Sequence, residues 1–148
     1  MRALLQRAAE ASVRVGGETV ATIGHGLVIL LGVGHDDDAD IADMLARRVT
    51  ELRIFRDEEG RTNRSLVDVR GAVLVISQFT LFADTSRGRR PGFTEAAPPE
   101  QAQRLYERFV AALREHDVRV ETGRFGAEMA VSLVNDGPFT IWLDTADR

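Results

Sequence analysis

Two short apolar runs set the strongest limit on how this chain can fold. Leu27 to Val33 is the longest apolar stretch, and Ala72 to Ile76 is a second run apolar enough for a buried β-strand. Neither approaches the roughly 18 apolar residues that a membrane-spanning helix requires. The N-terminus also lacks the charged-then-apolar layout of a secretion signal. We therefore expect a cytoplasmic protein built around buried strands, with no membrane partner.

The first 34 residues are expected to form β-structure. The alanines at residues 8–11 favour a helix by propensity. However, Val13 to Val15 alternates, and Gly16-Gly17 is a hairpin signal, with Thr19 to Ile23 as the returning strand. Gly24 to Gly26 would make a second turn. The strands expected later in the chain are Ile54–Asp57, Leu66–Val67, Val118–Glu121, Met129–Val134 and Phe139–Asp144.

Two segments have the apolar periodicity of amphipathic helices. Asp38 to Arg53 is the first, and the aspartates at its start can cap it and complement its dipole. Pro98-Pro99-Glu100 begins the second, because proline is tolerated in the first turn of a helix. The order of elements predicts one α+β domain over residues 1–148, with β-rich sheet layers covered by two main helices. The expected apolar faces are Ile41, Met44, Leu45, Val49 and Leu52, and then Leu105, Tyr106, Phe109, Val110 and Leu113.

Missing residue types narrow the chemistry that the chain can perform. There is no Cys and no Lys, since all 19 basic residues are Arg, and only three His are present. Thiolate nucleophiles, zinc–thiolate sites and Schiff-base lysines are therefore excluded. His35 with Asp36 to Asp38 and Asp40 could be imagined as a metal site, but helix capping explains these residues more simply. We expect no metal and no cofactor, so any catalysis must use carboxylates, hydroxyls, backbone dipoles or the substrate itself.

The overall charge argues against a long nucleic-acid interface. The formal net charge is −4 and the pI is near 5.4, so the strongly basic surface typical of nucleic-acid binders is missing. Binding one end of an RNA needs only a few arginines. The densest basic cluster is Ser86 to Pro91, with Arg87, Arg89 and Arg90. It is interpreted either as a solvated loop or as a set of phosphate contacts.

The segment Ser77-Gln78-Phe79-Thr80-Leu81 places small polar groups directly after a buried strand. If the strand ends at Ser77, the next residues can curl and direct N–H groups at one point, where they would stabilise a developing oxyanion in ester hydrolysis. Thr80 is a poor nucleophile without a base, and no His, Lys or acid lies within the motif. Thr80 is therefore expected to orient the ester or a water molecule. The alternative is that these hydroxyls only satisfy backbone groups at a strand end.

The segment Asn135-Asp136-Gly137-Pro138 interrupts two β patterns and is interpreted as a hairpin turn. Proline removes a donor from the returning strand, and an X–Pro bond adopts the cis isomer at a cost of only about 0.5–1 kcal/mol. A cis Gly137–Pro138 bond could direct its carbonyls one way and exclude a substituent on one side of a chiral carbon. An ordinary tight turn is the alternative, and the sequence does not decide the isomer.

Both motifs resemble the signature of the D-aminoacyl-tRNA deacylases, which hydrolyse D-amino acids from tRNA. The resemblance implies a three-layer deacylase-type fold and a homodimer. In that dimer the cis Gly137–Pro138 of one subunit would reach the partner's site and reject L-amino acids. The resemblance covers nearly the whole chain, since further family-like segments occur in the same order: Gln6-Arg7, Phe55-Arg56-Asp57, Ala83-Asp84-Thr85, Arg90-Pro91 and Gly123-Arg124-Phe125.

The resemblance also implies roles for particular residues. Gly137 and Pro138 would be the chiral selector, Arg7 would help to hold their segment, and Met129 would touch the substrate end. The expected reaction is hydrolysis of the ester between a D-amino acid, or glycine, and the 3′ end of tRNA. The RNA 2′-hydroxyl is the implied helper, which suits motifs without a side-chain base. The catalytic site for the terminal adenosine and the ester would be formed by Ser77, Gln78, Phe79 and Thr80.

Three other functions remain possible on the sequence. The first is a related deacylase that clears small L-amino acids from mischarged tRNA. The second is a non-catalytic module that binds RNA ends. The third is a small-molecule esterase, against which the lack of a nucleophile–base pair argues.

Overall fold

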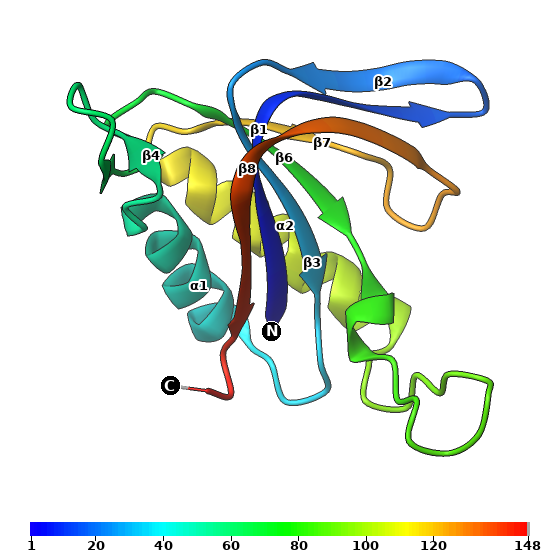
Figure 1. Ribbon diagram of the computed structural model, residues 1–148. Coiled ribbons are helices and arrows are strands. Elements are labelled where there is room, and N and C mark those ends of the chain that lie inside the picture. Colours follow the sequence, from blue (N-terminus) through cyan, green and yellow to red (C-terminus); the bar gives the residue numbers. More distant parts are fainter. Residues whose placement is uncertain (148) are drawn as a thin grey trace.

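One long strand organises the sheet of this protein. In the computed structural model, which describes residues 1–147, β1 (Arg2–Val15) pairs antiparallel with β3 (Gly26–Gly32) along its first half and with β2 (Glu18–Ile23) along its second. The predicted hairpin turn lies between β1 and β2, where Gly16 and Gly17 have φ of 57° and 80°. On its other side β1 pairs with β8 (Ala130–Asp144), so this one strand contacts three others (Figure 1).

The centre of the sheet is parallel. β3 pairs in parallel with β6 (Ala72–Ser77), and β6 pairs in parallel with β7 (Arg119–Thr122). The strand order is β2-β1-β3-β6-β7, with β8 added on β1. Because β6 lies between two neighbouring strands, the first five of its six residues, Ala72 to Ile76, are all buried. The two apolar runs in the sequence thus form adjacent central strands.

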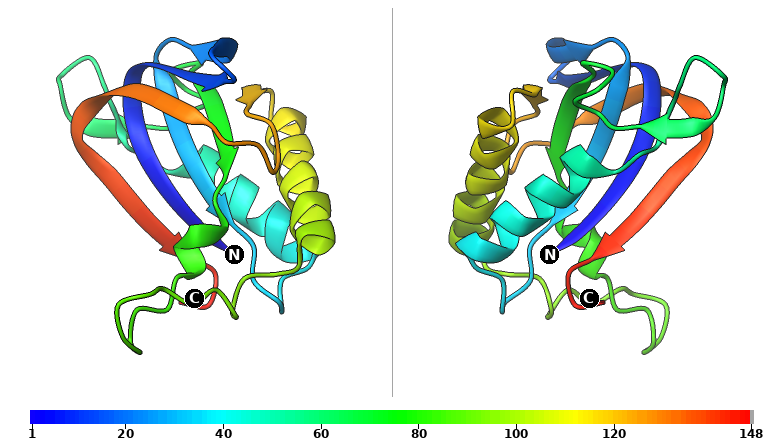
Figure 2. Two further views of the ribbon diagram at one scale, coloured as in Figure 1. Left: turned by 90° about the vertical axis from the view of Figure 1, so that its right-hand side faces the viewer. Right: turned by 90° about the vertical axis from the view of Figure 1, so that its left-hand side faces the viewer.

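Both helices cover the same face of the sheet (Figure 2). α1 (Ala39–Glu51) is capped as predicted, since the side chain of Asp38 accepts a hydrogen bond of 2.9 Å from the N–H of Ile41. α2 (Pro99–Glu115) begins with the predicted proline. Neither helix has the length and apolar character needed to cross a membrane, within residues 1–147. The strands and the two helices confirm the predicted α+β fold class.

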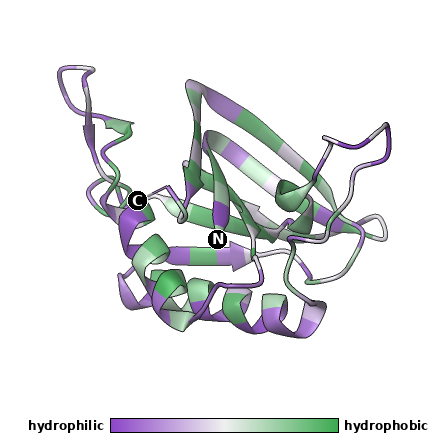
Figure 3. Cartoon of the chain, turned by 90° about the horizontal axis from the view of Figure 1, so that it is seen from below, coloured by the Kyte–Doolittle hydropathy of each residue, from purple (hydrophilic) through white to green (hydrophobic). Residues whose placement is uncertain are grey.

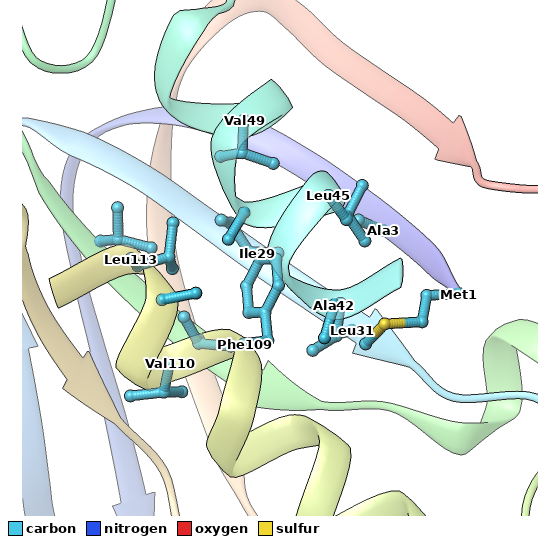
Figure 4. Packing of buried hydrophobic residues seen from close by; sticks show 14 of the residues in the cluster. Met1, Ala3, Ile29, Leu31, Ala42, Leu45, Val49, Phe109, Val110 and Leu113 are labelled. Atoms are coloured by element: carbon cyan, nitrogen blue, oxygen red, sulfur yellow. The ribbon is translucent and has the colours of Figure 1, made fainter. Parts of the chain in front are cut away.

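The main core lies between the helices and the sheet. Side chains alternate along a strand, so Ile29 and Leu31 of β3 face the helices whereas Val28 faces the other side. Figure 4 shows Leu45 of α1 and Phe109 of α2 over these strands. The predicted α2 face is buried throughout. The buried face of α1 differs from the predicted one, because it also contains alanines. Its buried residues are Ala42, Leu45, Ala46, Val49 and Thr50. Ile41 and Leu52 are only partly buried, and Met44 is exposed.

The opposite face of the sheet is covered only in part. The second half of β1, β2 and the first half of β8 curl over it and enclose a smaller apolar cluster around Val13, Leu74 and Ile76. Neither α1 nor α2 lies on the rest of this face (Figure 2). Leu4 pairs with Leu30 on one side and with Trp142 on the other, and Trp142 is 46% exposed. A strip of half-covered apolar side chains therefore remains on the sheet.

Two predictions of local structure are wrong. Leu66–Val67 is not a strand but part of a hydrogen-bonded turn, in which the N–H of Gly71 donates to the carbonyl of Leu66. The side chain of Leu66 is fully buried, which explains the misleading apolar signal. The short strand in this region is instead β5 (Thr62–Arg64), which pairs with β4 (Phe55–Arg56).

The second wrong prediction is the hairpin at residues 135–138. β8 runs without reversal from Ala130 to Asp144, because β1 is long enough to pair with both of its halves. Register shifts between Gln6 and Glu10 of β1 mark a bulge in β8 that contains Gly137 and Pro138. Proline has no N–H for the ladder, so it is tolerated where the pairing is already interrupted. The Gly137–Pro138 peptide bond is cis.

Candidate active site

The first motif forms the end of β6 and a change of direction, as predicted. The N–H of Gln78 still bonds to the carbonyl of Leu31, at 2.8 Å. The chain then enters the short 3-10 helix η1 (Phe79–Phe82). Within residues 1–147, the backbone N–H groups of Phe79 and Thr80 have no hydrogen-bond acceptor, as expected for the first residues of a helix. Two backbone donors are therefore free beside the strand end.

A pocket of about 640 Å³ opens beside this strand end. Ser77, Gln78, Phe79 and Met129 line it, so it brings together four of the residues selected from the sequence. Thr80 lies next to the pocket in the chain but does not line it. The rest of the lining is mostly apolar and comes from segments far apart in the sequence: Leu31, Val33, Ile76, Phe93, Ala96, Ala97, Pro98, Pro99, Ala102, Phe125, Gly126, Ala127 and Val131.

Aromatic side chains form part of the pocket wall. The rings of Phe79 and Phe93 meet edge to face, with centroids 5.0 Å apart. Phe79 is nevertheless 55% exposed, more than any other large apolar side chain in the described part of the chain. Phe93 was not selected from the sequence, because it belongs to the loop 83–97 and carries no local signal of a site.

Gly123 shapes the pocket by leaving room for Met129. A Cβ atom on Gly123 would lie 2.5 Å from the sulfur of Met129 and 3.2 Å from Cδ1 of Ile76. No real Cβ atom approaches its neighbours so closely, so any larger residue would displace Met129. Gly123 and Phe125 stood within a family-like segment of the sequence, which was the one available sign that they contribute.

The hydroxyl of Thr80 has no base beside it. Among residues 1–147 its side-chain partner is the amide of Gln78, which donates to Oγ1. The three histidines are engaged elsewhere: His25 packs against Phe55, His35 bonds to the carbonyl of Thr94, and His116 ends α2. Burial raises the pKa of Tyr106, behind the pocket, to about 12, so its hydroxyl stays protonated and donates to the carbonyl of Val75. Among residues 1–147, the pocket thus offers donors and apolar surface, and no general base.

The second motif is held by Arg7. This side chain is only 1% exposed, and its guanidinium donates to the carbonyls of Asp136, at 3.0 Å, and Ile54, at 2.7 Å. A longer contact of 3.5 Å reaches the carbonyl of Gly137. The guanidinium also lies 4.3 Å from the centre of the Phe139 ring, a cation–π contact. Arg7 therefore fixes the main chain on both sides of the bulge.

Ion pairs and amide hydrogen bonds also hold this segment, and we call Arg7, Arg56, Asn135 and Asp136 together the clamp. The carboxylate of Asp136 pairs with Arg7, at 3.0 Å, and with Arg56, at 3.2 Å. Partial burial of Asp136 acts to raise its pKa, but the hydrogen bond from Arg56 and the charge of Arg7 outweigh it and lower the pKa. The amide of Asn135 donates to the carbonyls of Arg7 and Phe139. Arg7 and Asn135 thus hold the main chain on either side of Gly137 and Pro138, which are themselves exposed.

The two motifs do not meet within the chain. Ser77, Gln78 and Phe79 lie at the end of β6, whereas Gly137 and Pro138 lie midway along β8 and do not line the pocket. Arg7 is likewise absent from the pocket lining. The structure therefore separates the predicted site residues into a pocket and a clamped bulge.

Relatives of similar length identify the class of protein. A D-aminoacyl-tRNA deacylase of Dinoroseobacter shibae is 62% identical over 145 residues, covering 97% of this chain and 99% of the relative. A protein of the same name from Thermus aquaticus is 57% identical over 148 residues, covering 100% and 97%. Together these matches identify the chain as a hydrolase. The chain belongs to the family described as D-Tyr-tRNA(Tyr) deacylase, whose model matches residues 4–144.

Solved structures agree with this assignment. One described as c-Myc DNA Unwinding Element Binding Protein is 39% identical, has a TM-score of 0.92, and covers 98% of this chain and 99% of its own. One described as a probable eukaryotic D-amino acid tRNA deacylase has a TM-score of 0.84 and covers 96% and 97%, but at 19% identity it supports the fold alone. The family resemblance and the fold expected from the sequence are confirmed.

Proposed function

We propose that this protein hydrolyses the ester between a D-amino acid, or glycine, and the 3′ end of tRNA. The observation that carries the proposal is the pocket at the end of β6. It combines an apolar, aromatic wall with the Ser77, Gln78 and Phe79 segment in a member of the deacylase family. Its volume of about 640 Å³ lies within the usual range for small-molecule sites, about 300–1,000 Å³. A terminal nucleoside is a ligand of this size and character.

Within the pocket, the apolar wall would hold the terminal adenosine through the exposed ring of Phe79. The free N–H groups of Phe79 and Thr80 are available to stabilise the oxyanion that forms when water attacks the ester. Thr80, linked to Gln78, would orient the ester or the water, and Met129 would contact the aminoacyl end. Because the described part of the pocket has no general base, the neighbouring 2′-hydroxyl of the RNA is the best available proton acceptor.

Chirality would be selected by a second copy of the chain. Gly137 and Pro138 do not line the pocket of their own subunit, yet Arg7 holds them in one conformation. Such rigid main chain can reject a side chain on one face of the α-carbon if it enters the pocket of a partner. The half-covered strip formed by Leu4, Leu30 and Trp142 gives that partner an apolar surface on which to pack. A homodimer follows from this proposal, and the reaction would take place in the cytoplasm without a metal.

The direct test compares D-Tyr-tRNA with L-Tyr-tRNA as substrates of the wild-type protein. Release of D-Tyr should be faster than release of L-Tyr by about a hundredfold or more, because a misplaced side chain must fit against fixed main chain. The D-specific activity should persist after dialysis against EDTA. Similar rates for the two enantiomers would defeat the selector, whereas tRNA binding with no hydrolysis of either would indicate a non-catalytic RNA-end module.

Light scattering of the same sample tests the assembly. The expected mass is that of two chains, and Trp142→Glu should shift it toward one chain by placing a charge in the apolar strip. A fully active monomer would contradict the contribution of Gly137 and Pro138 from a partner.

A further inference from the structure

The arginine-rich loop beside the pocket is a built hairpin. Asp84 and Gly92 exchange two backbone hydrogen bonds, each 2.8 Å long. The carboxylate of Asp84 accepts from the N–H and the hydroxyl of Ser86, and these bonds lower the pKa of Asp84. Gly88 turns the tip with a φ of 85°. The segment 84–92 projects from the body of the molecule (Figures 1 and 3), and we call it the arginine hairpin.

The three arginines of this hairpin are unpaired. Arg87, Arg89 and Arg90 are all exposed, and none has an ion pair or a side-chain hydrogen bond with residues 1–147. The acid at the base of the hairpin, Asp84, is occupied by Ser86. Many other arginines do have carboxylate partners: Arg2, Arg7, Arg47, Arg56, Arg61, Arg108 and Arg119. A protein of net charge −4 thus concentrates free positive charge at one projecting element.

The arginine hairpin leads directly into the pocket wall. Phe93, which follows it in the chain, contacts Phe79 and lines the pocket. The next residues are fixed to the body, because His35 bonds to the carbonyl of Thr94 at 2.6 Å and the N–H of Ala97 bonds to Val33 at 2.9 Å. Phe93 lies three positions after Arg90, a span of at most about 11 Å. A ligand chain that leaves the pocket on this side would therefore pass the arginines within a few of its units.

We propose that Arg87, Arg89 and Arg90 bind the phosphates of the nucleotides that precede the terminal nucleoside of the RNA. The inference rests on the proposed function and names the part of the substrate that the pocket cannot hold. The planar guanidinium donates two parallel hydrogen bonds to a phosphate, and it is always charged. Because the molecule as a whole repels RNA, a local positive element beside the pocket supplies the attraction that presents the 3′ end to Phe79.

The test removes the three charges and compares a long substrate with a minimal one. The triple variant Arg87→Ser, Arg89→Ser, Arg90→Ser should lower kcat/KM for D-Tyr-tRNA about tenfold at 0.1 M salt. The slope of log kcat/KM against log salt should become shallower by about 2, since each contact to a single strand contributes about 0.7. Cleavage of D-tyrosyl-adenosine, which has no such phosphates, should stay at the wild-type rate.

A matched control carries the same change of charge elsewhere. Arg47→Ser, Arg48→Ser, Arg61→Ser alters exposed arginines of α1 and of the turn before β5, and it should leave the rate and the salt slope on D-Tyr-tRNA unchanged. Replacing the three hairpin arginines by Lys instead of Ser should keep most of the wild-type salt slope. An unchanged rate and slope in the Ser variant would overturn the inference, and so would an equal loss on both substrates.

Failure of the proposed function would look different, because the wild-type protein would then cleave neither ester. In that case the proposal is tested by measuring the binding of tRNA that carries no amino acid. The hairpin Ser variant should bind more weakly than wild type with a shallower salt slope, and equal slopes would overturn the proposal. Circular dichroism should show the same fold in all variants. The hairpin arginines have no ion pair in the described part of the chain, and the ion pairs of the control residues Arg47 and Arg61 are exposed and contribute little to stability.

Discussion

The end of β6 and the bulge of β8 carry the two sequence motifs, and they use their polar groups in opposite ways. At the end of β6, the N–H groups of Phe79 and Thr80 are free, and the Phe79 ring is more than half exposed. At the bulge, Arg7, Asp136 and Asn135 are bonded to one another or to main-chain carbonyls. Free donors suit a surface that receives a ligand, whereas satisfied ones suit main chain that must keep its position. Under the proposed function, the end of β6 would bind the substrate and the bulge of β8 would select its chirality.

The largest expected effect comes from breaking the clamp with Arg7→Leu. This change removes a buried guanidinium and leaves the carbonyls of Asp136 and Ile54 without their donor. Each carbonyl left without its donor costs about 1–3 kcal/mol of the free energy of unfolding. Urea denaturation measures it, and deacylation of D-Tyr-tRNA should fall as well. The control Arg47→Leu breaks an exposed pair with Glu51 and should scarcely move the midpoint.

Gly137→Ala should lower the deacylation rate and leave the stability of the fold unchanged. A Cβ atom on Gly137 would meet only Oδ1 of Asn135, at 3.3 Å, so the subunit accepts it after a small adjustment. Under the proposed function the same methyl group enters the partner's pocket, where a displacement of about 1 Å costs about a hundredfold in rate. Initial rates on D-Tyr-tRNA, beside an unchanged urea midpoint, check this. Gly24→Ala is the control, because nothing lies within 4 Å of its Cβ position. Full activity of Gly137→Ala would remove the bulge from the mechanism.

Thr80→Val should have the smallest effect and would sharpen the account of the pocket. If Thr80 orients the ester or water through a hydrogen bond, its loss costs about 0.5–1.5 kcal/mol and lowers kcat about tenfold. If Thr80 were a covalent nucleophile, the loss would be several orders of magnitude. Single-turnover hydrolysis of D-Tyr-tRNA distinguishes the two, and Thr62→Val, in the exposed strand β5, serves as the control. Complete inactivation would contradict the orienting role.

Much of the secondary structure could be predicted because its signals are local. The alternation in Val13 to Val15 and the glycine pair after it predicted the first hairpin, and the side chain of Asp38 caps α1 as expected. The end of the buried strand at Ser77 followed from the change from apolar to polar residues. Each of these patterns depends only on residues a few positions apart.

The wrong predictions concern residues whose local pattern is explained by contacts with residues far away in the sequence. Asp136-Gly137 resembles a turn, but the long partner strand β1 holds β8 straight through it, and Arg7 occupies the space that the bulge creates. Leu66 is apolar because it fills the core beneath a turn, not because it belongs to a strand. Met44 has helical spacing, but the smaller alanines of α1 lie closer to the sheet and leave it exposed.

The sequence by itself determined the fold class and the strand end that carries Ser77 to Thr80, because side-chain periodicity and residue chemistry are properties of the chain. The family followed from the resemblance of its motifs. Only the tertiary structure decided which other residues share the pocket, among them Phe93 and Phe125, and that Arg7 grips the bulge of β8. The physical reason is that a pocket wall and a buried guanidinium depend on segments that meet only when the sheet is assembled. Their positions follow from strand pairing and register, which no single stretch of the chain contains.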